Sequence, residues 1–194
     1  MKKQSSLIVC AFIILININL EAQSFHFGLK LEMFGLVNEK VRDKETYSTK
    51  FVLSETPSIY AVLQQGITET VSINLKPGVL ITNADEGFTG IELGVFVEKK
   101  LSFQNVFLSG GVNLHLNMNH AYGAGWVDVS DVKLIPFIVL GAGYNLNENV
   151  SLDLNIHQAL LSEYGYDSID PDVFNVSGLK KIYSLIKIGI QAYF

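Results

Sequence analysis

The sequence closes with Leu185-Ile186-Lys187-Ile188-Gly189-Ile190-Gln191-Ala192-Tyr193-Phe194, a stretch in which apolar residues recur at every second position. The apolar set comprises Ile186, Ile188, Ile190, Ala192 and Phe194. A period of two predicts a β-strand with one apolar face. A length of about ten residues suits a strand that crosses a bilayer at a tilt. An edge strand of a soluble sheet is the other interpretation of this stretch taken alone.

Alternation of the same kind recurs along the chain and predicts eight strands in total. The other strands are expected at residues 25–34, 58–66, 70–81, 88–98, 101–117, 132–146 and 150–160. The segment 58–66 alternates so poorly that its faces stay unassigned. The polar stretch 37–57 has room for a short hairpin extension around residues 47–53. Pro77 lacks the N–H that a ladder uses, which predicts a bulge or a local irregularity there.

The first residues have the features of a secretory signal peptide. Lys2 and Lys3 precede an apolar run from Leu7 to Leu20, and Ala22 offers a small residue for cleavage. We therefore expect a signal peptide at residues 1–22 and one barrel domain at residues 23–194. Cys10 follows Val9, where a lipoprotein signal has a small residue, so no lipid anchor is expected. Removal of the signal leaves a chain without cysteine.

The composition narrows the class of protein. Hydrophobic residues make up 48% of the chain, yet after the signal no segment holds the roughly 20 consecutive apolar residues of a membrane helix. Apolar content that is spread in alternation is typical of a barrel. The formal net charge is −5 and Arg42 is the only arginine, which excludes a nucleic-acid-binding role, since such a role needs clustered Lys and Arg.

The connections between the expected strands fall into two classes. They are short after the second, fourth and sixth strands and longer after the others. An up-and-down barrel places each class at its own rim, and outer-membrane barrels have short periplasmic turns and long outer loops. The fold class is therefore expected to be all-β, an eight-stranded antiparallel up-and-down transmembrane β-barrel in the bacterial outer membrane.

Two motifs carry a resemblance to a known family. They are Leu134-Ile135-Pro136-Phe137-Ile138-Val139-Leu140-Gly141-Ala142-Gly143-Tyr144 with the turn that follows, and the Tyr193-Phe194 ending. They resemble the small OmpA/OmpX-type barrels and the related PorT-like outer-membrane family. The resemblance implies that Phe194, with Tyr193, is an assembly signal read by the barrel assembly machinery. The PorT-like likeness also implies a possible secretion-system partner.

The distribution of charge separates a membrane barrel from a secreted lipocalin, the strongest rival fold. Each clear strand has one aliphatic face, and the opposite face carries Lys30, Glu32, Lys76, Glu92, Lys133, Asp153, His157 and Lys187. A lipocalin would bury these charges around its ligand, at several kcal/mol for each unpaired ion. A membrane barrel places the aliphatic faces in lipid and lets charges of both signs pair in the lumen. We expect a lumen charge network of these eight residues, with no continuous water pore.

Candidate chemistry in the sequence is sparse. His115, His157 and Asp153 lie on polar faces and could be combined with Ser109 or Ser151 into a catalytic triad, but such residues are expected on any polar wall. An acidic loop with Asp167, Asp170 and Asp172 lacks the spacing of the EF-hand calcium loop. We expect no catalytic residue, no metal site and no cofactor. Tyr122 and Trp126 in the third long loop are candidates for a binding surface.

The functional expectation is a non-enzymatic outer-membrane protein with a structural or surface-binding role exerted through its outer loops. Its expected partners are outer-membrane lipid, the assembly machinery and a surface or secretion-system protein. Three alternatives stay open: a lipid A-modifying enzyme, a narrow channel for small solutes and a component of a secretion system.

If Phe194 is an assembly signal, its loss affects biogenesis more than stability. Deletion of Phe194 is expected to lower sharply the amount of heat-resistant, membrane-inserted protein in cells. The same variant refolded from urea into detergent still forms a barrel, because a rim aromatic contributes less than the roughly 3–5 kcal/mol of a core Phe. Heat-modifiability on gels measures both. Unaffected assembly in cells, or equal failure in both assays, contradicts the signal hypothesis.

Overall fold

The computed structural model describes residues 24–42, 45–82, 87–102, 105–118, 133–166, 169–170, 175–176 and 179–194. Its strands are β1 (Phe25–Arg42), β2 (Glu45–Leu53), β3 (Ser58–Gly66), β4 (Val71–Leu80), β5 (Gly90–Lys100), β6 (Val106–Asn117), β7 (Lys133–Asn145), β8 (Val150–Ala159), β9 (Glu163–Tyr166), β10 (Ile169–Asp170), β11 (Asn175–Val176) and β12 (Leu179–Tyr193). No helix in these ranges is long and apolar enough to cross a membrane. The signal peptide expected at residues 1–22 lies outside the described residues.

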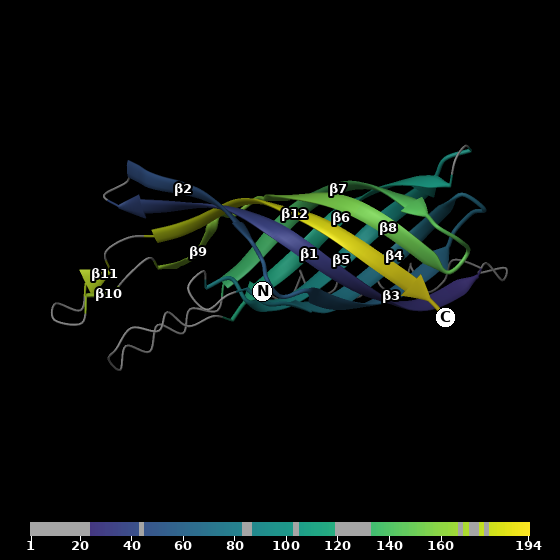
Figure 1. The fold of residues 1–194 in the computed structure, drawn as a ribbon, viewed down its shortest axis with the longest axis horizontal. Helices are drawn as coiled ribbons and strands as arrows, with labels where there is room; N and C mark the ends of the chain where they lie inside the picture. Colours follow the sequence, from purple (N-terminus) through teal and green to yellow (C-terminus); the bar gives the residue numbers. More distant parts are fainter. Residues whose placement is uncertain are drawn as a thin grey trace, which may run out of the picture.

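Eight of these strands form a closed ring (Figure 1). From β1 the order runs through β3, β4, β5, β6, β7 and β8 to β12, which pairs back with β1. Every neighbouring pair in the ring is antiparallel. The expected eight-stranded antiparallel up-and-down barrel is therefore confirmed. Closure also satisfies the backbone groups that an open sheet edge would leave unpaired in lipid.

The two faces of the barrel wall have opposite polarity. Exposed aliphatic residues cover the outside, among them Leu29, Leu31, Leu93, Val95, Leu114, Leu140, Leu154, Ile156 and Ile188. Buried polar residues alternate with them on the inside. The faces of β3, which the sequence left open, are now defined: Ser58, Tyr60 and Val62 are buried, whereas Ile59 is exposed. A soluble barrel has the reverse arrangement, so this polarity is that of a barrel that spans a bilayer.

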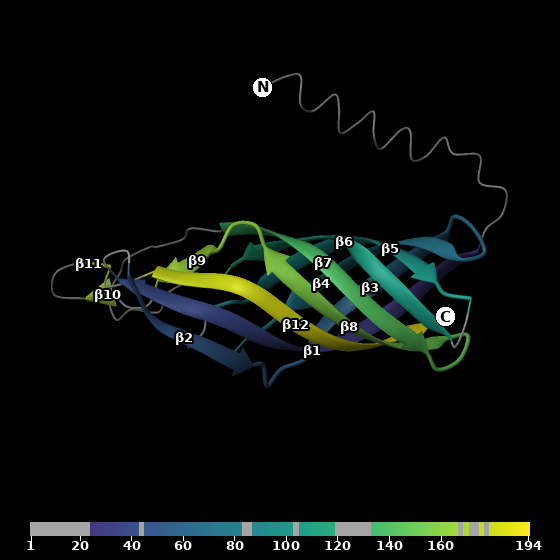
Figure 2. The same cartoon turned by 90° about the horizontal axis from the view of Figure 1, so that it is seen from above.

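β1 and β12 continue together beyond the ring at one end (Figure 2). There the far half of β1, from Gly35, pairs with β2 and no longer with β3, and the first residues of β12 pair with β9. The four strands β2, β1, β12 and β9 thus form a small sheet that we call the extension. The hairpin extension expected around residues 47–53 is confirmed, with β2 paired antiparallel to the far half of β1. β1 runs further than the predicted 25–34 because both of its sides stay paired.

The end opposite the extension carries the short connections, and we call it the turn end. The strands expected at residues 88–98 and 101–117 leave Lys99 and Lys100 as a tight turn between them; this is wrong. Both lysines belong to β5 and pair with Leu108 and Phe107 of β6. Pairing therefore continues for two further residues, and the turn lies after it, where Asn105 adopts a left-handed φ of 52°.

The irregularity expected at Pro77 is an interruption of one ladder and not a bulge. The paired residues of β3 and β4 pass from Tyr60 opposite Gly78 to Leu63 opposite Leu75 with no change of register. Pro77 itself lies opposite Leu93 in an unbroken ladder with β5. The missing N–H of proline therefore affects only the β3 side.

Arginine placed on the outer face is expected to destabilise the barrel in a depth-dependent way. Leu154 and Ile188 face each other across β8 and β12 and are 48% and 61% exposed on the apolar belt. Either one replaced by Arg lowers the free energy of unfolding by about 2–4 kcal/mol. Ile138 lies opposite the polar Gln158, nearer the extension, and the cost of Ile138→Arg is smaller. Urea unfolding from lipid vesicles measures all three.

Leu160→Arg, just past the end of β8, is the matched control and costs about 0–1 kcal/mol, as at an interface. Wild-type stability of the Leu154 and Ile188 variants would contradict the assignment of the outer face.

Candidate functional site

The interior of the barrel has three levels along its axis, and the one nearest the extension is apolar. Its buried residues include Phe34, Leu36, Leu80, Phe88, Ile135, Phe137, Tyr164, Ile182 and Leu185. Tyr164 comes from β9 and packs edge-on against Phe88, with ring centroids 5.3 Å apart. The side-chain amide of Asn117 donates to the backbone oxygen of Tyr164 at 2.9 Å and holds β9 over the barrel mouth. A hydrophobic seal therefore closes this end.

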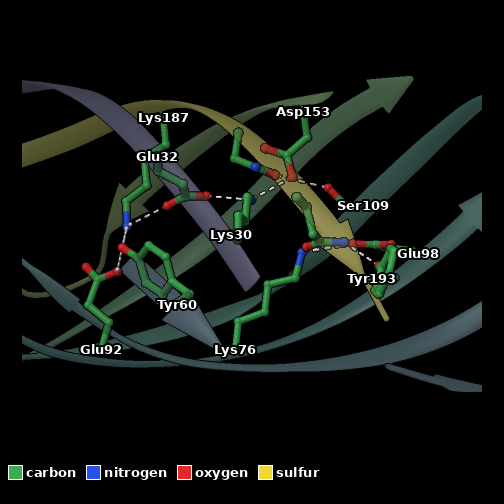
Figure 3. A network of polar contacts seen from close by, with 12 residues as sticks. Lys30, Glu32, Tyr60, Lys76, Glu92, Glu98, Ser109, Asp153, Lys187 and Tyr193 are labelled. Atoms are coloured by element: carbon green, nitrogen blue, oxygen red, sulfur yellow. Dashed lines mark hydrogen bonds and ion pairs between the residues drawn. The ribbon is translucent and has the colours of Figure 1, made fainter. Parts of the chain in front are cut away.

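The middle level is a network of buried charges centred on Lys187 (Figure 3). Its ammonium lies 2.6 Å from Glu92 Oε2 and 3.5 Å from Glu32 Oε2. It also donates to the Tyr60 hydroxyl at 2.8 Å, and that hydroxyl donates to Glu92 at 2.7 Å. Lys187 is fully buried, so its charge is compensated by these groups and not by bulk water.

Lys30 and Lys76 extend the network toward the turn end. Lys30 Nζ lies 2.5 Å from Glu32 Oε1 and 2.6 Å from Asp153 Oδ2, so Glu32 is shared with Lys187. Lys76 pairs separately with Glu98 at 3.0 Å. The Lys76 ammonium also lies 5.0 Å from the centroid of the Phe96 ring, within the range of a cation–π contact.

Small residues make room for these long side chains. A Cβ at Gly189 would lie 2.5 Å from Cε of Lys30 and 2.8 Å from Oδ1 of Asp153. A Cβ at Gly94 would lie 2.3 Å from the ring of Phe96. The result is a filled lumen: the hollow left among the network side chains measures about 10 Å³, roughly the room needed by one water molecule. Packed side chains therefore occupy the middle level.

The predicted members of the lumen network have different positions. Lys30, Glu32, Lys76, Glu92, Asp153, His157 and Lys187 are all buried in the middle level. Lys133 is only partly buried and lies opposite Asn117, at the extension end of β7 and away from this cluster. His157 has the Phe137 ring edge-on to it at 5.9 Å between centroids.

The catalytic alternative finds no support in the contacts of its residues. His115 Nδ1 lies 3.2 Å from Glu92 Oε1, and its ring stacks on Phe88 at 4.1 Å. The Ser109 hydroxyl donates to Asn155 at 3.1 Å, and not to a histidine. Among the described residues, no three His, Cys, Asp or Glu side chains are arranged to hold a metal ion.

The two residues expected to form an assembly signal point in different directions. Phe194 is 77% exposed on the outer face; its amide donates to the Phe27 oxygen at 2.8 Å, and the two rings are 6.5 Å apart. Tyr193 turns inward, where its hydroxyl accepts a hydrogen bond from Gln191 and its ring meets His26 edge-on. The loop candidates Tyr122 and Trp126 lie outside the described residues.

Sequence reasoning missed two members of the network and the apolar seal. Tyr60 was missed because Ala61, Gln64 and Gln65 blur the alternation of its strand. Glu98 was not among the expected members of the network, although its parity with Glu92 was the available signal. The seal was missed because several inward aromatic residues sit on faces that elsewhere are polar.

Comparisons with known proteins find similar folds at low sequence identity. Neisserial surface protein A is 15% identical over 90% of this chain and 100% of its own, with a TM-score of 0.48. The N-terminal barrel domain of Pseudomonas aeruginosa OprF is 14% identical over 86% and 97%, with a TM-score of 0.46. OprH from P. aeruginosa is 15% identical over 87% and 99%, with a TM-score of 0.45. No family model matches the chain, and no curated protein matches it.

The location of the protein follows from its own architecture. A closed antiparallel barrel with an even number of strands, an apolar outer belt and a polar interior is the form in which proteins span bacterial outer membranes. The protein is an integral outer-membrane β-barrel. Short turns mark the periplasmic rim of such barrels, so the turn end faces the periplasm and the extension faces outward.

Removal of the central cation is expected to destabilise the barrel strongly. Lys187→Met leaves Glu92 and Glu32 buried without their shared partner, which costs about 3–5 kcal/mol. The matched control is Lys181→Met on the same strand. Lys181 pairs with Glu163 at 3.9 Å, and both side chains are partly exposed, so its loss costs less than about 1 kcal/mol. Urea unfolding in vesicles compares the two variants, and equal stability would refute a structural role for the network.

Proposed function

We propose that the protein is a non-enzymatic outer-membrane barrel that binds another protein at the cell surface through the extension. The observation that carries this proposal is the continuation of β1 and β12 beyond the ring, with β2 and β9 paired on either side. The ring closes without β2 and β9. Barrel closure therefore does not explain why the chain builds this sheet.

The extension supports protein binding because it offers strand edges. Among the described residues, no further strand pairs with the far side of β2 or of β9. An exposed strand edge presents a row of N–H and C=O groups that a strand of another protein can pair with. The Ser54 amide donates to the Phe34 oxygen, so the N–H of Ser54 points toward β1. Because the N–H direction alternates along a strand, the N–H groups of Phe51 and Thr49 point toward the far edge of β2.

The interior of the barrel supports the proposal because its side chains disfavour two alternative functions. The apolar seal and the filled charge network argue against the narrow-channel alternative. The Ser109 hydroxyl donates to Asn155 and not to a histidine, which argues against the serine–histidine pair of the lipid A-modifying alternative. Tyr122 and Trp126 remain candidates for further contacts at the same surface, a secretion-system protein remains one possible partner, and Phe194 remains a candidate signal for the assembly machinery.

Crosslinking in intact cells tests the extension. A photoreactive residue at Lys50, next to the free edge of β2, is expected to give a protein adduct, whereas one at Val95 on the lipid belt does not. Thr49→Pro removes one outward N–H and is expected to reduce the adduct at position 50 by roughly tenfold, since one lost edge hydrogen bond and altered strand geometry weaken pairing.

Thr49→Val is the matched control, because it keeps the N–H and loses only the hydroxyl, and it retains the adduct. The absence of an adduct at Lys50, or an adduct that Thr49→Pro leaves unchanged, contradicts strand pairing at this edge. Conductance of purified protein in a planar bilayer, or turnover of lipid A, would favour the corresponding alternative.

A further inference from the structure

The third level of the interior is a polar hollow of about 430 Å³ that opens at the turn end. Each of the eight barrel strands contributes at least one residue to its wall, from His26 of β1 to Tyr193 of β12. The barrel is thus closed by the apolar seal on one side of the charge network and hollow on the other. Only a molecule from the periplasm has access to this hollow.

The hollow is open at the turn end, but part of its wall is buried and held in place. Glu98, Phe107 and Ser151 line it although they are only 6%, 4% and 2% exposed. Glu98 is fixed by Lys76 at 3.0 Å and by Gln64 at 3.4 Å, and Gln64 also donates to Ser72 at 3.1 Å. The polar groups facing the hollow are therefore preorganised, as in sites that bind small molecules.

Several polar groups at the hollow have no protein partner. Within the part of the chain that the structure describes, the side chains of Lys100, Asn145 and Ser151 make no hydrogen bond or ion pair. Gln191 is 2% exposed and donates to Tyr193, which lines the hollow, yet its own carbonyl oxygen is buried without a partner. The side chains of Asn145 and Ser151 in the wall thus offer a ligand both donors and acceptors that no described protein group uses.

The lining also indicates what kind of ligand fits. Lys76 compensates Glu98, and the remaining charges of Lys100 and Glu148 have opposite signs, so the wall favours a neutral molecule. Amides and hydroxyls both donate and accept hydrogen bonds. The rings of Phe107 and Tyr193 add apolar surface.

We propose that this hollow binds a small neutral carbohydrate from the periplasm. Its volume lies in the lower part of the range of small-molecule sites and suits one or two sugar rings. The hollow and the extension lie at opposite ends of the barrel. The proposal therefore goes beyond surface binding and is tested independently of it.

Titration of the refolded protein in a detergent without a sugar headgroup tests the site. The probes are glucose, N-acetylglucosamine and cellobiose, with glycine betaine as a polar molecule without hydroxyl groups, and saturation-transfer NMR reads out binding. Saturable binding is expected for at least one sugar and not for the betaine. Asn145→Leu, which removes a partly buried amide that holds no other side chain, is expected to weaken binding by roughly fivefold, since each lost hydrogen bond to the ligand is worth about 1 kcal/mol.

Two further variants test whether sugar binding depends on the wall of the hollow. Gln64→Leu removes a second amide from the wall and is expected to weaken binding similarly. Gln158→Leu makes the same change on the outer face, where Gln158 contacts the backbone of Tyr183, and is expected to leave binding unchanged. Heat-modifiability confirms that each variant has formed a barrel. Absence of saturable sugar binding, betaine binding of equal strength, or equal affinity of all variants overturns the proposal.

Discussion

The pairing of β1 with β12 is the interaction on which the rest of this structure depends. It runs from Gly28 opposite Tyr193 to Val41 opposite Leu179 and turns a row of strands into a ring. Without it, two strand edges would face lipid, where each unpaired backbone group costs several kcal/mol. The same pairing carries the extension and brings Lys30 and Glu32 on β1 close to Lys187 on β12.

Closure of the ring also explains why charges can be stable inside it. The wall excludes lipid and bulk water, so ammonium groups and carboxylates rely on each other, and shared partners such as Glu32 connect two lysines at once. The interior is then graded along the axis: an apolar seal, a charged centre and a polar hollow. The two proposed binding surfaces lie at opposite ends, one built from strand edges and the other from polar side chains around an open hollow.

Most of the fold could be predicted because lipid outside and polar groups inside impose a strict period of two. Leu154 and Ile188 could be assigned to the outer face by counting alone. β3 could not, because Ala61 and two glutamines weaken its contrast, and Tyr60 was lost with it. The turn after Lys100 was misplaced because two adjacent lysines resemble a turn in composition, whereas the ladder with β6 extends past them.

The site was harder to predict than the fold. Parity identifies which charged side chains face inward. Which of them form ion pairs depends on their position along the barrel axis and around its circumference, and counting along one strand does not give these positions. Lys133 shows the difference, because it shares the inward parity and lies at another level from the central cluster. The inward aromatic residues of the seal follow the same parity as the charges, so alternation alone could not separate the three levels.

The seam between β1 and β12 also has a consequence for the order in which the barrel folds. Its contacts join distant parts of the chain: the Tyr183 hydroxyl donates to Glu39 across a separation of 144 residues. Hairpins between consecutive strands lose little entropy on loop closure and can form early. Pairing of β1 with β12 closes the longest loop of the ring and therefore has the largest entropic cost. The buried charges that cross the seam find their partners only at that step. A partly folded intermediate would therefore hold Lys30 and Lys187 apart, and desolvation of the lumen would coincide with the final pairing event.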